Sequence, residues 1–106
     1  MTESDQEILS ALKEKGGLVE FSDIEAHLSR DAVFLVSPAL TLEEVALAVA
    51  KDKSSQVEAW IHRAQVSRPR EEQIENWRKG SQKLQTMIVA PFVFVQEPGP
   101  IEGNLS

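Results

Sequence analysis

Two pairs of side chains in this sequence combine the residue types and the spacing that acid–base chemistry needs. Asp23 precedes His27 by four residues, and Glu58 precedes His62 by four. Residues four apart lie on one face of a helix, so each carboxylate could orient its imidazole and stabilise the imidazolium. Such pairs could serve a small enzyme or supply two ligands of a metal ion. Alternatively, they are ordinary exposed helix contacts that each stabilise by roughly 0.2–0.5 kcal/mol.

The other ingredients of a catalytic or metal site are missing from the sequence. The chain has no cysteine, which excludes disulfides and thiolate ligands. Ser22, Thr41 and Ser55 each precede a glutamate by three residues, the spacing of a helix-capping box, so capping accounts for these hydroxyls. The nucleophile-elbow, P-loop and dinucleotide-binding glycine patterns do not occur. We therefore assign no catalytic, cofactor-binding or metal-binding residue and expect no cofactor.

A run of basic residues near the middle of the chain forms a candidate phosphate-binding patch. Its members are Arg63, Arg68, Arg70, Arg78, Lys79 and Lys83. Glu71, Glu72 and Glu75 are interleaved with them, as on a solvated helix face. The net charge is −6, with the acidic excess in residues 1–53, and an acidic chain repels phosphate backbones and anionic lipids. Nucleic acid is a disfavoured partner, and we expect no membrane association.

A helix-turn-helix or winged-helix-like nucleic-acid-binding protein is the alternative reading. Residues 42–61 predict an alanine-rich buried helix, a short turn and a second helix, the general layout of that motif. However, Glu58 near the start of the second helix would face phosphate with the wrong sign. A strand expected at residues 32–37 also lies where a winged helix would place its recognition helix.

Length and composition predict one α+β domain over residues 1–96, followed by a flexible tail over residues 97–106. With 42% hydrophobic and 26% charged residues, the chain resembles ordinary globular proteins. The tail is rich in proline and glycine and has little to bury. The N-terminus lacks the features of a secretion signal, and no apolar run is long enough to span a bilayer. We expect a cytoplasmic protein.

Hydrophobic periodicity predicts a small sheet packed against four to five helices. Helices are predicted over residues 5–15, 23–29, 41–51, 55–64 and 69–79. Strands are predicted near residues 18–21, 32–37, 84–90 and 92–96.

The uncharged run from Leu84 to Gln96 is the most apolar part of the chain and must be core. Pro91 cannot donate a ladder hydrogen bond, so it divides the run into two strands joined by a kink or bulge, or lies at a sheet edge. Residues 87–95 are apolar on both sides of the strand. If the helices leave one side uncovered, that side is a candidate interface, composed of Met87, Val89, Phe92 and Phe94. Otherwise the helices cover both faces.

Three segments together resemble a known bacterial family: VSPALTLEEVALAVAKDKSSQVEAWI, REEQIENW and MIVAPFVFVQE. They are similar to domain-of-unknown-function family 2288, whose members end in a proline-interrupted strand with a tryptophan after the proline. The resemblance covers roughly residues 11–97, and the chain departs from it at Phe92 and Ala64. The family implies no known activity, cofactor or catalytic residue.

The leading hypothesis is a non-enzymatic protein that works by association, either with itself as a homodimer or with an unidentified protein partner. In this hypothesis, the basic segment from Arg63 to Lys83 meets the acidic N-terminal half of a neighbouring molecule.

Overall fold

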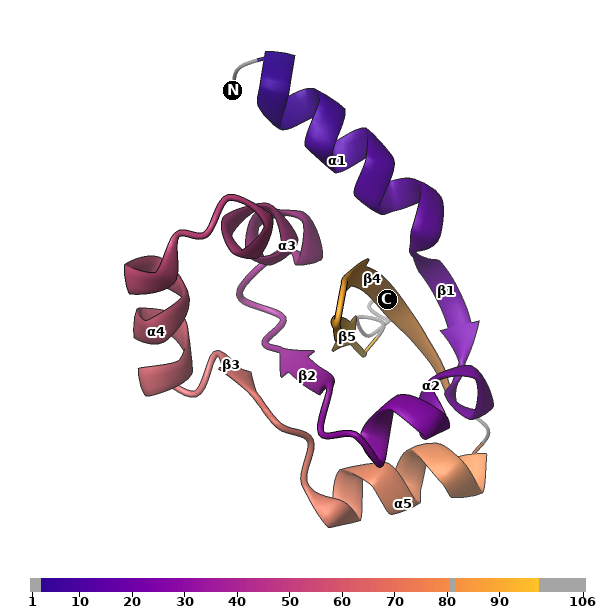
Figure 1. Cartoon of the computed structure of the whole chain (residues 1–106). Coiled ribbons are helices and arrows are strands. Elements are labelled where there is room, and N and C mark those ends of the chain that lie inside the picture. Colours follow the sequence, from indigo (N-terminus) through magenta and orange to yellow (C-terminus); the bar gives the residue numbers. More distant parts are fainter. Residues whose placement is uncertain (1–2, 81, 98–106) are drawn as a thin grey trace, which may run out of the picture.

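The computed structural model describes residues 3–80 and 82–97 and shows an α+β fold (Figure 1). The described helices are α1 (Glu3–Lys15), α2 (Phe21–Leu28), α3 (Leu42–Ala50), α4 (Ser54–His62) and α5 (Glu71–Gly80). The described strands are β1 (Gly17–Glu20), β2 (Val33–Val36), β3 (Val66–Ser67), β4 (Lys83–Val89) and β5 (Phe92–Gln96). The predicted fold class is confirmed. Most of the predicted tail, residues 98–106, lies outside the described residues.

The strands form one mixed sheet in the order β1-β4-β5-β2-β3. All neighbouring strands are antiparallel except β2 and β5, which run parallel. The apolar run at residues 84–96 supplies β4 and β5, which pair as a hairpin with Val89 opposite Phe92. Pro91 therefore does divide the run, as predicted, but at a hairpin turn instead of a kink or bulge. In the turn its missing N–H costs no ladder hydrogen bond.

Helices pack on both faces of the sheet, which explains why the hairpin is apolar on both sides. On one face α1, α3 and α4 cover a cluster that includes Val45, Trp60, Met87 and Phe94. On the other face lie α2 and α5, whose cluster is composed of Phe21, Ile24, Val33, Trp77, Leu84, Val93 and Val95. Figure 1 shows α2 and α5 together on the side of the sheet away from α3. The sequence left two alternatives, a sheet with one uncovered face or a sheet with helices on both faces. The second is correct for most of the sheet.

The second face is completed by the residue that follows β5. Trp77 of α5 is 2% exposed, and its Nε1–H donates to the Glu97 carboxylate at 2.8 Å. The Phe21 ring packs against this indole, with the centroids 6.1 Å apart. The predicted flexible tail thus begins with a residue whose side chain is held by the core.

One of the three predicted capping boxes is present, at the start of α3. The Glu44 N–H donates to the Thr41 hydroxyl at 3.1 Å, and the Thr41 N–H donates to the Glu44 carboxylate at 2.8 Å. At α4 the cap is Lys53, which makes no side-chain capping hydrogen bond, so the prediction at Ser55 is wrong. Ser55 instead lies inside the first turn of the helix.

The predicted cap at Ser22 is also wrong, because α2 begins one residue earlier than Ser22. The Glu20 N–H donates to the Asp23 carboxylate at 3.2 Å, which moves the box two residues toward the N-terminus. This start lets Phe21 leave the strand direction and enter the core, where it is 3% exposed. Burial of a large ring outweighs the choice between two capping residues that lie two positions apart.

The capping box of α3 should contribute measurably to stability. We expect Thr41→Ala to lower the free energy of unfolding by about 1 kcal/mol, because the Glu44 N–H loses its acceptor. Ser55→Ala is the matched control, since the same sequence signature is not used there, and it should change stability by less than about 0.5 kcal/mol. Urea unfolding followed by circular dichroism measures both. Equal losses at the two positions would contradict the assigned caps.

The close approach of α1 to β4 depends on Gly16. A methyl group at this position would overlap the Thr86 carbonyl oxygen and lie 3.3 Å from the Met87 Cα. We expect Gly16→Ala to destabilise the protein by about 1–3 kcal/mol, because backbone atoms must shift. Gly80→Ala is the control, since a methyl group there meets nothing within 4 Å. The control should be neutral or slightly stabilising in the same urea titration, and a comparable loss in both variants would refute this packing.

Candidate functional site

The structure contains an apolar hollow of about 150 Å³ on the face covered by α1, α3 and α4. Seven apolar residues line it: Phe34, Val49, Val57, Ile61, Val66, Phe92 and Phe94. They come from five elements, with α3 and α4 on one side and the strands on the other. The parallel pairing of β2 with β5 sets Phe34 directly beside Phe94, which creates the aromatic floor.

The floor of the hollow is a cluster of three phenylalanine rings. Phe34 meets Phe92 edge-on at 5.7 Å between centroids and stacks on Phe94 at 5.9 Å. The guanidinium of Arg68 lies over the Phe34 ring, 5.9 Å from its centroid. These ring contacts hold the floor in one shape, and Arg68 places a positive charge at its border.

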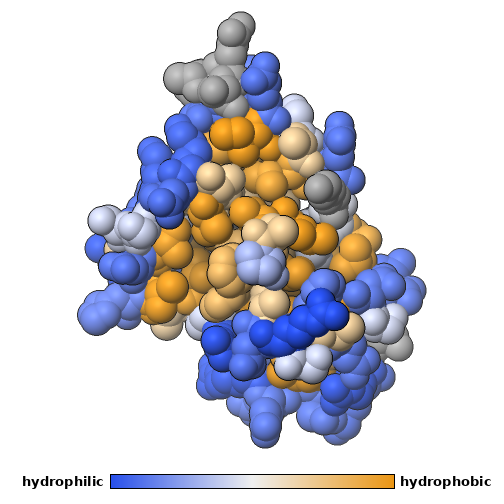
Figure 2. Space-filling view, viewed as in Figure 1, coloured by the Kyte–Doolittle hydropathy of each residue, from blue (hydrophilic) through white to orange (hydrophobic). Residues whose placement is uncertain are grey.

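Two large apolar side chains at the borders of the hollow are exposed to solvent. Ile61 on α4 is 49% exposed, and Phe92 at the start of β5 is 37% exposed. Viewed as in Figure 1, hydrophobic side chains gather across the middle of the molecule, between α1 and α3 on one side and α2 and α5 on the other, with hydrophilic side chains around them (Figure 2). Contiguous exposed apolar surface with a polar rim is typical of a binding surface.

The structure contradicts half of the interface predicted from the hairpin. Met87 is 4% exposed and Phe94 is 3% exposed, because the helices of this face cover them, so neither can contact a partner across an open sheet. Val89 is partly buried. Phe92 is exposed as the prediction requires, and it borders the hollow.

Sequence reasoning missed Ile61. Val57, Trp60, Ile61 and Ala64 follow helical spacing, which predicts that all four face inward. α4 packs at the β3 edge of the sheet, and β3 is only two residues long. This edge buries Trp60 but leaves Ile61 uncovered one residue later. The signal was absent because the length of the strand beneath a helix cannot be read from the periodicity of that helix.

The two carboxylate–histidine pairs are not brought together. Asp23 and His27 lie on α2, whereas Glu58 and His62 lie on α4, and these helices cover opposite faces of the sheet. The Asp23 carboxylate accepts the Glu20 N–H and so serves the cap of its helix. Within residues 3–80 and 82–97, no group of three or more histidine, aspartate or glutamate side chains is placed to hold a metal ion.

The basic residues are distributed over several elements, and two of them are engaged by acidic residues far away in the sequence. Arg78 pairs with Glu25 at 2.9 Å and with Glu75 at 3.0 Å, while its guanidinium lies over the Phe21 ring. Arg68 pairs with Asp31 at 3.5 Å. The remaining members of the predicted patch are Arg63 at the end of α4, Arg70 before α5, Lys79 in α5 and Lys83 in β4.

The helix-turn-helix layout corresponds to α3 and α4, but its second helix is poorly equipped for phosphate. Within α4, Glu58 is the one charged side chain before His62. Trp60 anchors the helix to the core of the sheet face. No described helix is long and apolar enough to cross a bilayer.

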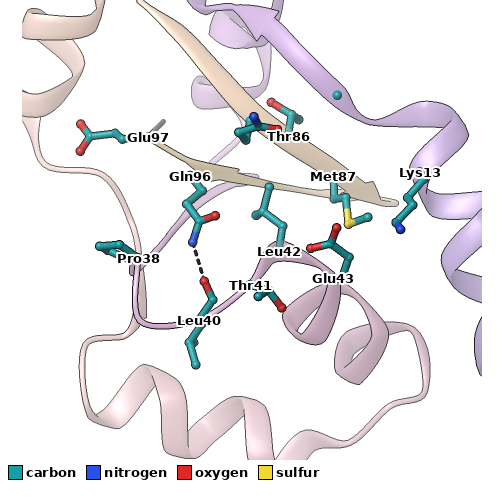
Figure 3. A pocket seen from close by; sticks show the side chains of 12 residues that line it. Lys13, Pro38, Leu40, Thr41, Leu42, Glu43, Thr86, Met87, Gln96 and Glu97 are labelled. Carbon is teal, nitrogen blue, oxygen red and sulfur yellow. Dashed lines mark hydrogen bonds between the residues drawn. The ribbon is translucent and has the colours of Figure 1, made fainter. Parts of the chain in front are cut away.

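A second concavity, the groove, lies at the far end of the same sheet face and has a volume of about 580 Å³ (Figure 3). It is bounded by the end of α1, the start of α3, the middle of β4 and the end of β5. Its wall includes Lys13, Leu40, Leu42, Glu43, Met87 and Gln96. Unlike the hollow, it combines charged, amide and apolar side chains.

Comparison with known proteins supports the family resemblance. The chain is similar to PA1075 from Pseudomonas aeruginosa, whose solution structure was determined by NMR. The two share 26% sequence identity with a TM-score of 0.74, and the match covers 93% of this chain and 89% of the other. Curated proteins gave no match. The family model described as "Protein of unknown function (DUF2288)" matches residues 7–97. The chain therefore belongs to the DUF2288 family.

Proposed function

We propose that this protein works without a chemical step, by forming a homodimer in which the apolar hollow of each copy receives Ile61 of the other. The observation that carries the proposal is the pair of exposed apolar side chains, Ile61 from α4 and Phe92 from β5, that line one apolar hollow. Full burial of a side chain of this size contributes about 1.5–3 kcal/mol, and a partner that covers the parts of Ile61 and Phe92 still in water would gain the corresponding fraction of it. The lack of cysteine supports a reducing compartment, the cytoplasm, as the place of action.

The shape of the surface favours a second copy as the occupant. In a two-fold symmetric interface, the same patch of both subunits meets, and it must be complementary to itself. The hollow provides a recess, and Ile61 beside it provides a projecting side chain. A two-fold axis that lies in the plane of the interface, at right angles to the line between the two borders, lays the α4 border of each copy over the sheet border of the other. A recess of about 150 Å³ with apolar walls suits one side chain of this size.

Charges at the two borders are also complementary under this symmetry. Glu58 precedes Ile61 by three residues and therefore neighbours it on the α4 surface. Arg68 lies at the sheet border, over Phe34, and its pair with Asp31 is widely exposed. Exposed ion pairs of this kind contribute little to stability. Arg68 can therefore leave Asp31 and pair with Glu58 of the other copy at a small cost in free energy. Opposite charges facing one another set the register of the contact.

The dimer should be reversible, because the exposed apolar area is far smaller than in obligate dimers. We expect sedimentation equilibrium between about 10 and 500 μM to show a monomer–dimer equilibrium. Ile61→Ser or Phe92→Ser should raise the dissociation constant by at least about tenfold, since each removes burial at two symmetric places. Leu18→Ser is the matched control, because Leu18 is 55% exposed on β1, outside the hollow.

Charge exchange tests the symmetry of the same interface. Glu58→Arg and Arg68→Glu should each weaken dimerisation, and the double variant should recover it, because the pair is restored with reversed signs. Circular dichroism confirms that each variant is folded. A wild-type monomer at about 500 μM, or a Leu18→Ser variant as impaired as Ile61→Ser, would overturn the proposal.

A further inference from the structure

The groove at the other end of α3 carries a hydrogen-bond acceptor whose orientation is fixed. Gln96 is the last residue of β5, and its side chain is partly buried. Its Nε2 donates to the carbonyl oxygens of Ser37 at 2.8 Å and Leu40 at 2.7 Å. Since carbonyl oxygens only accept, both amide hydrogens are committed and the amide cannot turn over without losing two hydrogen bonds.

The oxygen of this amide is the atom that remains available to recognise a ligand. Within the described part of the chain, no donor reaches the Gln96 Oε1. Figure 3 shows the side chain among the groove residues, with its nitrogen directed to the Leu40 carbonyl and its oxygen turned toward Leu42. A partly buried acceptor held in place without a donor is suited to an incoming N–H, because its orientation costs no entropy on binding.

The remaining walls add an apolar surface and three charged side chains, one basic and two acidic. Leu42 is 7% exposed and Met87 is 4% exposed, and they form the apolar part beside Leu40. Lys13 from α1 and Glu43 from α3 also line the groove, and among the described residues neither makes an ion pair with any other. With Glu97 also in the lining, the groove carries one positive and two negative side chains, which disfavours an anionic ligand and is compatible with a neutral one.

We infer that the groove binds a small peptide-like molecule, the size of one or two amino-acid residues. Its amide N–H would donate to the Gln96 Oε1, and its apolar side chain would lie against Leu40, Leu42 and Met87. The volume of about 580 Å³ falls within the usual range for small-molecule sites. Gln85 and Gln96 are paired on adjacent strands, and Met87 lies two residues further along β4, roughly 7 Å away, so one residue of ligand spans the distance. This inference does not depend on dimerisation.

Two capped probes that differ in one group test the inference. N-acetyl-leucine methyl ester carries a single N–H, and methyl 2-acetoxy-4-methylpentanoate replaces that N–H with oxygen. Titrations of ¹⁵N-labelled protein followed by NMR should show saturable shifts of the Gln96 side-chain amide and of the Leu42 and Met87 backbone amides. The acetoxy probe should bind at least about threefold more weakly, because it cannot donate to Oε1.

Variants locate the site. Gln85→Trp places a large ring on an exposed strand position that lines the groove, and it should abolish binding in a folded protein. Ile61→Ser, which alters the hollow, should leave binding unchanged and so separates this site from the dimer surface. Lys13→Gln and Glu43→Gln should leave the neutral probes unaffected within about twofold, because neither charge has a counterpart on them.

Three outcomes would overturn the inference. The first is the absence of saturable shifts at groove residues up to about 20 mM probe, which corresponds to a binding free energy too small for a specific site. The second is equal affinity for the two probes, and the third is retention of binding by Gln85→Trp.

Discussion

The β4–β5 hairpin is apolar on both faces, so the rest of the chain must supply one layer of helices for each face. Leu84, Val93 and Val95 point to one side, whereas Met87 and Phe94 point to the other, and all five are nearly inaccessible. Because the hairpin forms the centre of the sheet, β1 and β2 flank it and connect it to helices on both faces. This requirement places α2 and α5 opposite α1, α3 and α4, and it explains why Trp60 and Trp77 anchor opposite layers.

Coverage of the first face is limited by the length of α3. Nine helical residues extend about 13 Å, whereas the seven residues of β4 extend about 23 Å. Leu42 at the start of α3 lines the groove and Val49 near its end lines the hollow, so the helix leaves an opening at each end of the strands. Both candidate sites thus arise from a short helix on a longer hairpin.

Local interactions were predictable from the sequence, and those that depend on distant residues were not. The Thr41 box was correct because its two hydrogen bonds lie within four residues. Ser22 and Ser55 carry the same signature, yet burial of Phe21 moves one helix start, and the other helix starts after Lys53 without a side-chain capping hydrogen bond. The two-residue strand β3 is too short to produce periodicity, and without it the exposure of Ile61 could not be foreseen.

Proline at position 91 and the uncharged run around it located the central hairpin, but they did not predict that helices cover Met87 and Phe94. The groove left no sequence signal, because Gln96 meets the carbonyls of Ser37 and Leu40 across more than fifty residues.

The two openings differ in polarity because different backbone demands meet at each end of the hairpin. At one end, the chain leaves β2 and turns into α3, and the carbonyls of Ser37 and Leu40 require donors, which Gln96 supplies. A polar side chain is therefore required at this position, and the amide oxygen of Gln96 remains available to a ligand. At the other end, the strands join through a tight turn of the hairpin, and the hollow beside it is lined by apolar side chains, Phe92 and Phe34 among them. An apolar partner suits that end and a molecule with an N–H suits the first, so neither occupant can substitute for the other.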